Sequence, residues 1–201
     1  MRGHRRSLVL VALVLALAAC GDDGETADAE PTGAGRPTSG GEHVGPADEG
    51  IEGVEAFRVA SNEHTEEDLR YDPSPPVGGD HFPVPATCGF YEEGTEPPEE
   101  MLVHSLEHGA VWVAYDPDLD EGARQALSSL VAQQAKVIAT PHDGLDAPLV
   151  VSAWGRQLEL DDVADPRLQQ FIDLYRNSGN APEPYAACQG AGEPAVAAPA
   201  A

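Results

Sequence analysis

Two histidines four residues apart mark the stretch of this chain best suited to chemistry. His104 and His108 lie within Val-His-Ser-Leu-Glu-His-Gly, with Glu107 between them. On a helical turn both imidazoles lie on one face and can converge on one cation, with the carboxylate in reach as a base or a further ligand. The stretch also matches His-x-x-Glu-His, the inverted zinc-protease signature. Because Gly109 and a run of valine and aromatic residues follow at once, we expect the turn to end at His108, which argues against a protease helix.

Further ligands of a similar chemical kind lie upstream. His81 follows a segment rich in proline and glycine, in which glycines let the backbone turn sharply. Imidazole nitrogen and thioether sulfur suit copper and zinc, and they suit Mg²⁺ and Ca²⁺ poorly. We therefore predict a transition-metal site, for copper first and zinc second. Its predicted ligands are His81, His104 and His108, with His64, Met101 and Glu107 as additional candidates. The alternative is that the histidines only form hydrogen bonds between loop and core.

No catalytic constellation accompanies these ligands in the sequence. Ser105 lies beside His104 but lacks the Gly-x-Ser-x-Gly turn of an activated serine, and no glycine-rich phosphate loop followed by Lys-Ser or Lys-Thr occurs. We assign no catalytic residue and favour binding over catalysis. Two other hypotheses stay open: a metal-dependent hydrolase that uses Glu107 as general base, and a non-catalytic interaction module of the cell envelope.

The first twenty residues have the features of a bacterial secretory leader with a lipidation site. Three arginines precede an uncharged run over residues 8–19, which is too short to span a bilayer as a helix. The sequence Leu-Ala-Ala-Cys-Gly that follows resembles the lipobox, in which cleavage occurs before the cysteine and the cysteine is acylated. We predict a signal peptide over residues 1–19 and a lipid on Cys20, which makes the membrane a partner and places the protein at its extracytoplasmic face. The alternative is an ordinary signal peptide followed by a chance cysteine.

Two further cysteines complete the cysteine content of the chain. Once Cys20 carries lipid, only Cys88 and Cys188 remain. Two cysteines in an exported protein favour one disulfide, because disulfides persist in oxidising compartments. Two free thiols are the alternative.

The charge of the chain excludes nucleic acid as a partner. The sequence has 35 acidic and 11 basic residues, a formal net charge of −24, and Lys136 is its one lysine. A phosphate-binding surface needs clustered lysine and arginine. Nothing in the sequence identifies a protein partner.

Composition divides the mature chain into a domain and two flanking segments. Residues 20–50 are poor in large apolar residues, so we predict a lipidated cysteine followed by a disordered acidic tether. Residues 190–201 consist mainly of alanine, glycine and proline, and we predict a disordered tail there. The predicted folded domain spans residues 51–189, a usual domain size.

Regular structure is predicted mainly for the second half of this domain. Short apolar runs predict strands over 110–115, 136–140, 149–154 and 157–160, and apolar residues at helical spacing predict helices over 119–131 and 166–177. The order predicts an α+β fold: a small, mostly antiparallel sheet with two helices on one side and a loop-rich N-terminal half containing many prolines and glycines. We expect His43 and His142 to be solvent-exposed.

Several motifs together resemble the bacterial domain of unknown function 3105 family over about residues 55–188. The most specific are the stretch from Val103 to Gly109 and Ala-Trp-Gly-Arg at 153–156. The others are residues 71–76 with Gly79 and His81, Gly-Phe-Tyr at 89–91, Tyr-Asp-Pro at 115–117, Phe-Ile at 171–172 and Ala-Pro-Glu at 181–183. The family usually has Pro-Pro-Thr-Ser-Gly-Pro-His where this chain has Pro-Pro-Val-Gly-Gly-Asp-His, so the histidine is kept and the two hydroxyls are not. The resemblance implies an exported or membrane-anchored bacterial protein and supplies no established activity.

Overall fold

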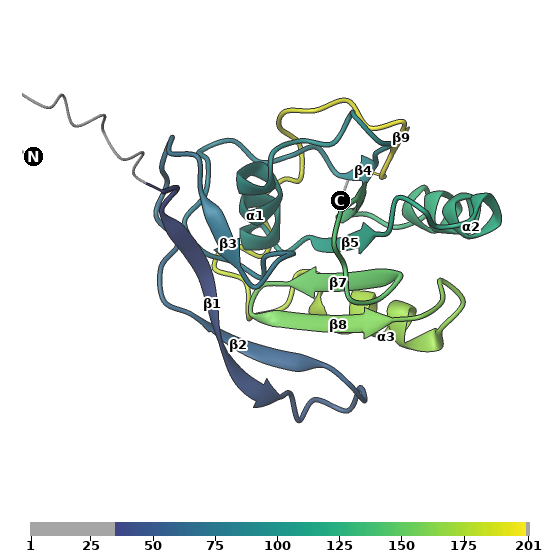
Figure 1. Ribbon diagram of the computed structural model, residues 1–201, viewed down its shortest axis with the longest axis horizontal. Helices are drawn as coiled ribbons and strands as arrows, with labels where there is room; N and C mark the ends of the chain where they lie inside the picture. The colour runs from purple at the N-terminus through teal and green to yellow at the C-terminus, as the bar shows by residue number, and fades with distance from the viewer. Residues whose placement is uncertain (1–34, 200–201) are drawn as a thin grey trace, which may run out of the picture. The chain divides into compact units, whose positions relative to one another are not determined.

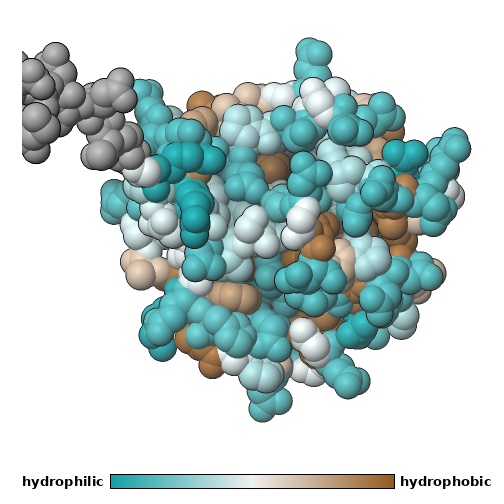
Figure 2. Space-filling view, in the orientation of Figure 1, coloured by the Kyte–Doolittle hydropathy of each residue, from teal (hydrophilic) through white to brown (hydrophobic). Residues whose placement is uncertain are grey.

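The computed structural model describes residues 35–199. The predicted signal peptide over residues 1–19 and the predicted lipid on Cys20 lie outside these residues. Within them, none of the helices is both long and apolar enough to cross a membrane. Hydrophilic side chains cover most of the face shown in Figure 2, and apolar residues appear there in small patches.

The described residues form one nine-stranded sheet and three helices (Figure 1). The strands are β1 (Thr38–Pro46), β2 (Glu55–Val59), β3 (Arg70–Asp72), β4 (Gly89–Phe90), β5 (Val111–Tyr115), β6 (Val137–Pro141), β7 (Leu149–Ala153), β8 (Arg156–Leu160) and β9 (Val196–Ala197). The helices are α1 (Glu99–Glu107), α2 (Glu121–Val131) and α3 (Pro166–Tyr175). The strand order is β3-β1-β2-β8-β7-β5-β6-β4-β9.

The α+β class predicted from the sequence is confirmed, but the sheet is mixed and larger than expected. The pairs β1–β3, β4–β6 and β5–β6 are parallel, and the other five neighbouring pairs are antiparallel. The predicted strands correspond to β5, β6, β7 and β8, and the predicted helices correspond to α2 and α3. These elements have strong apolar patterns of their own, which explains why local sequence was sufficient to find them.

Strand β5 separates two apolar cores because successive side chains of a strand point to opposite faces. Val111 and Val113 belong to the core that includes the apolar residues of α2 and α3. Trp112 and Ala114 belong to the second core, which includes Leu102 and other apolar residues of α1. Helices α2 and α3 therefore cover one face of the sheet as predicted, while α1, where only a turn was expected, covers the other.

Strand β1 shows that the predicted disordered tether is wrong for residues 38–46. This strand pairs antiparallel with β2 and parallel with β3, although it contains few apolar residues. Its stability comes from backbone hydrogen bonds to partners that follow it in the chain, and no local apolar pattern reveals such partners. The prediction of a disordered tail is likewise wrong for residues 196–197, because β9 pairs with β4 and Val196 packs against the first core.

The predicted pairing of the two cysteines is confirmed. Cys88 and Cys188 form a disulfide with their Cα atoms 5.5 Å apart, and the backbone N–H of Cys88 donates to the carbonyl of Cys188 at 3.1 Å. The bond holds the segment after α3 against the chain that leads into β4.

Candidate metal centre

Helix α1 places three polar residues on one face. His104, Glu107 and His108 lie at the i, i+3 and i+4 positions, while Leu102 and Leu106 point into the second core. The helix ends where the sequence predicted, with His108 at its C-cap, and Gly109 follows with φ of +80°. A Cβ at Gly109 would lie 2.8 Å from the carbonyl oxygen of Pro184, so only glycine lets the C-terminal segment approach the helix end.

Two chain segments cover this face of α1 and bring two more histidines. The backbones of His64 and His81 form an isolated parallel bridge, and the N–H of His81 donates to the carbonyl of Glu63 at 3.1 Å. Gly79 has φ of +130°, and a Cβ there would lie 2.7 Å from the backbone nitrogen of Gly40. The glycine is thus required for the turn that buries His81, whose side chain is fully buried.

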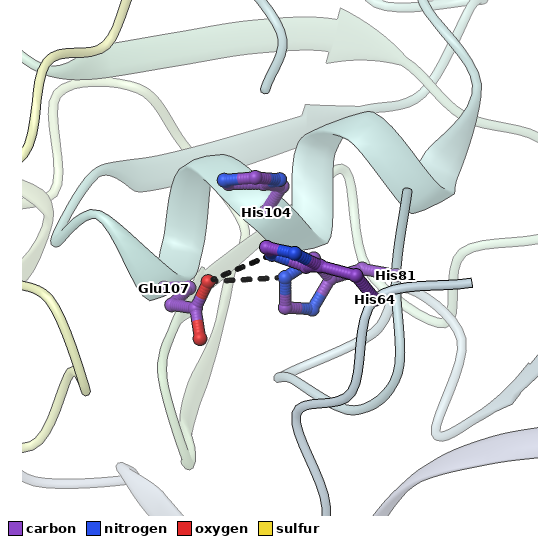
Figure 3. A group of neighbouring side chains, drawn as sticks. All are labelled: His64, His81, His104 and Glu107. Atoms are coloured by element: carbon purple, nitrogen blue, oxygen red, sulfur yellow. Dashed lines mark hydrogen bonds and ion pairs between the residues drawn. The ribbon is translucent and has the colours of Figure 1, made fainter. Parts of the chain in front are cut away.

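Four side chains from these elements form a group that we call the histidine–glutamate cluster: His64, His81, His104 and Glu107 (Figure 3). Each offers a ligand atom, and these atoms all lie within 4.8 Å of one another. His64 is 52% exposed and forms the solvent side of the cluster, while the other three side chains are buried.

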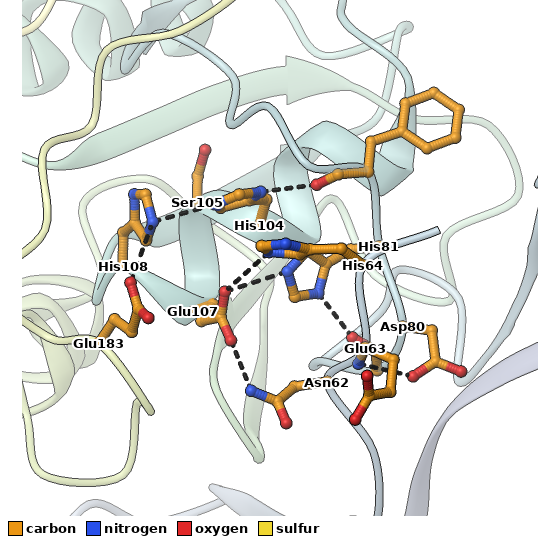
Figure 4. Close-up of polar contacts among 12 residues, drawn as sticks. Asn62, Glu63, His64, Asp80, His81, His104, Ser105, Glu107, His108 and Glu183 are labelled. Carbon is orange, nitrogen blue, oxygen red and sulfur yellow. Dashed lines mark hydrogen bonds and ion pairs between the residues drawn. The ribbon is translucent and has the colours of Figure 1, made fainter. Parts of the chain in front are cut away.

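A second group of three residues shares Glu107 with this cluster. Glu107, His108 and Glu183 also bring ligand atoms to within 4.8 Å of one another, and we call them the outer group (Figure 4). Glu183 is 62% exposed, and its Oε2 lies 3.7 Å from Nε2 of His108. The predicted ligand His108 therefore lies beside the cluster in the outer group.

Met101, predicted as an additional ligand, packs against the second core. Its side chain is a partly buried hydrophobic group packed against the second core. Its carbonyl accepts hydrogen bonds from the N–H of Ala86 and the hydroxyl of Ser105. The structure thus gives Met101 a packing role, and its part as an additional ligand stays a prediction.

His81, His104 and His108 are oriented in the same way. Each Nδ1–H donates to a backbone carbonyl: His81 to Gly79 at 2.8 Å, His104 to Phe82 at 2.6 Å and His108 to Ala187 at 2.7 Å. A carbonyl can only accept, so the hydrogen is on Nδ1 and the Nε2 of each neutral ring carries a lone pair. Metal-binding histidines are held in this manner, with one ring nitrogen fixed by an acceptor and the other free for the ion. The structural hydrogen bonds considered from the sequence therefore exist, and they leave the Nε2 atoms turned toward one another.

Two of these Nε2 atoms face each other without a hydrogen between them. The Nε2 atoms of His104 and His108 lie 3.0 Å apart, although each ring already uses its hydrogen on a carbonyl. Two lone pairs at this distance repel unless a proton or a metal cation lies between them. Burial lowers the pKa of His104 to about 4, more than its hydrogen bond to Phe82 raises it, so an added proton there is unfavourable at neutral pH.

Glu107 is the anion of the site. Its Oε2 lies 3.0 Å from Nε2 of His81 and 3.8 Å from Nε2 of His64, and its Oε1 accepts a hydrogen bond from the amide of Asn62 at 2.6 Å. A buried carboxylate is unfavourable unless charges or donors compensate for the lost water. Because His81 already donates from Nδ1, a proton or a cation must also lie between its Nε2 and Glu107.

Lys136 holds the end of α1 to the C-terminal segment. Its buried ammonium donates to the carbonyl of His108 at 3.0 Å, to Oδ1 of Asn177 at 2.7 Å and to the carbonyl of Pro184 at 2.9 Å. Burial lowers the pKa of Lys136. All three acceptors of this ammonium group are neutral oxygens, and none is a carboxylate. Lys136 therefore orders the backbone around His108 through hydrogen bonds.

His142 corrects a prediction, because its side chain is largely covered and lies beside Glu99 of α1. Its side chain is 13% exposed, with Nε2 2.9 Å from Oε1 of Glu99 and Nδ1 2.8 Å from the carbonyl of Asp143. Burial lowers the pKa of His142, but the hydrogen bond to Glu99 and the charge of Glu99 outweigh this effect. The pKa of His142 therefore lies above its usual value. His43, in contrast, is exposed on β1 as predicted.

Glu99→Gln is expected to destabilise the protein in a pH-dependent manner. A raised pKa means that the folded state binds the proton of His142 more tightly, so its stabilisation is present below the unfolded pKa and is lost as the pH rises through the folded pKa. We expect a difference in unfolding free energy of up to about 1 kcal/mol at about pH 5.5 that shrinks toward about pH 9. Urea denaturation of both proteins across this range measures it. A difference that does not change with pH would show that the ion pair contributes nothing.

Two contributors to the site were not found from the sequence. Asn62 and Glu183 lie 45 residues before and 76 residues after Glu107, in segments without a pattern of their own. The only available signal was the presence of Glu183 in the Ala-Pro-Glu motif at 181–183. Neither residue shares an element with the histidine motif, so spacing alone could not connect them to it.

Comparison with known proteins gives one result for this chain. A family model described as a protein of unknown function, DUF3105, matches residues 63–190. This range contains both cysteines of the disulfide and every residue of the histidine–glutamate cluster and the outer group. No curated protein and no solved structure matches the chain.

Proposed function

The chain belongs to the DUF3105 family of unknown function, and from that premise we propose that it binds a transition-metal ion, zinc or copper, at the histidine–glutamate cluster. The observation that carries the proposal is the orientation of two buried histidines. His81 and His104 both donate Nδ1–H to a backbone carbonyl. Their other ring nitrogens lie in the same cluster as the Glu107 carboxylate, in which all ligand atoms are within 4.8 Å of one another. A site that only braced the loops would need no such convergence of lone pairs.

The set of ligand atoms selects the metal. Three imidazole nitrogens and one carboxylate oxygen suit Zn²⁺ and Cu²⁺, whereas Mg²⁺ and Ca²⁺ prefer ligand sets made of oxygen alone. The case for Cu(I) depended on a thioether, and Met101 packs against the core. We therefore favour the divalent ions, of which zinc needs no redox partner.

Charge also supports a divalent ion at this place. Glu107 is the one carboxylate of the cluster, and the buried His104 is neutral because burial lowers its pKa to about 4. A divalent cation would compensate the buried carboxylate and satisfy the Nε2 lone pairs at the same time. The half-exposed His64 leaves a path by which the ion enters from solvent.

We also propose that lipid on Cys20 anchors the protein at the extracytoplasmic face of the cell membrane. The lipobox-like sequence around Cys20 supports this location. The disulfide between Cys88 and Cys188 agrees with it, since such bonds persist in oxidising compartments. The metal site of the anchored domain would then bind ions on the outer side of the membrane.

His104→Ala is expected to weaken binding of Zn²⁺ and Cu²⁺ by about 100-fold or more, because even the outer-shell partners of metal ligands contribute 10- to 100-fold in affinity. The measurement is calorimetric titration of the chelator-treated full chain, with metal analysis of the product. His43→Ala is the matched control, since His43 lies exposed on β1 beside Glu55. Equal uptake by the wild type and both variants, or no uptake by any, would contradict the proposal.

A further inference from the structure

The outer group lies where a second ion would complete the site. We propose that Glu107, His108 and Glu183 hold a second divalent cation, so that the protein carries a two-metal centre in which Glu107 is shared by both ions. This inference rests on the proposed function, because it extends the histidine–glutamate cluster. Metal ions in two-metal centres usually lie about 3.5–4 Å apart, which is compatible with a single shared carboxylate.

The contact between His104 and His108 is the first argument for a second ion. His104 is a buried member of the cluster, and its Nε2 lone pair serves the first ion. The Nε2 of His108 lies 3.0 Å from it and also carries a lone pair, since its hydrogen is donated to Ala187. His108 is not among the four residues whose ligand atoms converge on the first position. A second cation would satisfy the lone pair of His108, which otherwise faces two acceptors, Nε2 of His104 and the carboxylate of Glu183.

The position of Glu183 is the second argument, because the backbone around it is anchored on several sides. Its N–H donates to the carbonyl of Glu107 at 3.0 Å, and the next carbonyl, of Pro184, accepts from Lys136 at 2.9 Å. Four residues later Ala187 accepts from His108, and Cys188 is fixed by the disulfide. The Glu183 carboxylate is therefore carried to His108 by an ordered segment, although the side chain itself is 62% exposed.

The ligand atoms of the outer group point to a harder and more open position than the first. One imidazole and two carboxylates suit Zn²⁺ or Mn²⁺, and three protein ligands leave coordination positions for water or for an oxyanion of a bound ligand. The side chain of Glu183 is exposed, so such a ligand could reach this position. The second ion would thus be the accessible one of the two.

Titration with Cu²⁺ tests whether a second ion binds and whether it lies close to the first. The full chain, stripped with chelator, is titrated calorimetrically, and the loaded protein is examined by electron paramagnetic resonance. We expect two ions per wild-type chain with a signal broadened by coupling between neighbouring spins, and one ion with an isolated signal in Glu183→Gln. Glu193→Gln is the control, because Glu193 is an exposed carboxylate of the same segment and should leave both ions in place.

The outcomes separate this inference from the proposed function. One ion in the wild type that Glu183→Gln leaves unchanged would overturn the two-metal centre and keep the first site. Two ions without coupling, both retained in Glu183→Gln, would place the second ion elsewhere on this acidic protein and would also overturn it. No tightly bound ion in the wild type would overturn the proposed function itself.

Discussion

Replacing Glu107 with glutamine is expected to cause the largest loss of metal affinity of any single substitution in this protein, about 100-fold or more at each position. Glu107 is the one residue common to the histidine–glutamate cluster and the outer group, and it supplies the buried negative charge beside His81 and His64. Glutamine keeps the shape of the side chain and removes the charge. Calorimetric titration with Zn²⁺ should therefore show both binding events weakened together.

Glu100→Gln is the matched control for this substitution. Glu100 is a buried carboxylate on the same helix, and its Oε1 accepts from the N–H of Leu69 at 2.8 Å, away from the cluster. The amide oxygen of glutamine can accept the same hydrogen bond, so metal affinity should not change. Retention of full affinity by Glu107→Gln would contradict its assignment as a ligand. That result would favour the hydrolase hypothesis, in which Glu107 acts as a general base and the ion stays bound.

Loss of the disulfide is expected to produce the largest loss of stability, about 4 kcal/mol in the free energy of unfolding. Cys88 and Cys188 are separated by 100 residues, so the bond excludes many extended conformations from the unfolded chain. It also fixes the segment that carries Glu183 and the carbonyl of Ala187. The measurement is urea denaturation of the metal-free chain, comparing the oxidised wild type with a variant carrying Cys88→Ser and Cys188→Ser.

The same reductant applied to both proteins provides the control for this experiment. Reduction should lower the stability of the wild type to that of the double variant and should leave the double variant unchanged. A double variant as stable as the oxidised wild type would show that the bond contributes nothing to stability. Since the metal-free chain is used, this result does not depend on whether the proposed metal site exists.

Helix α1, which carries three residues of the site, shows how much of the site local sequence can predict. The spacing of His104, Glu107 and His108 placed them on one helical face, and Gly109 marked the end of that face. Both statements depend only on helical periodicity and on the conformational freedom of glycine, which are properties of a few neighbouring residues. The division of the face into two groups could not be predicted, because it depends on residues that other segments bring to it.

The strands show the same limit: local sequence finds those with an apolar pattern of their own and misses those that depend on distant partners. The apolar runs that became β5, β6 and β7 were predicted because each is buried on both faces and carries its own signal. In β8, Leu158 and Leu160 are buried and alternate with the exposed Glu159, which is the pattern of a strand buried on one face. The residues of β1 were predicted to be disordered because few of them are large and apolar. The partners that order them, β2 and β3, lie elsewhere in the chain. The pattern of a half-exposed strand with many polar residues does not distinguish it from a loop.

The sequence by itself therefore determined the α+β class, the central elements and the candidate ligands His64, His81, His104, His108 and Glu107. Only the tertiary structure separated His108 from the four residues of the cluster, joined it to Glu183, and turned Met101 to the core. It also assigned the hydrogen on each ring through the carbonyls of Gly79, Phe82 and Ala187. The physical reason is that periodicity and residue type are local, whereas the convergence of lone pairs depends on loops that are distant in sequence and are ordered only when the cores pack.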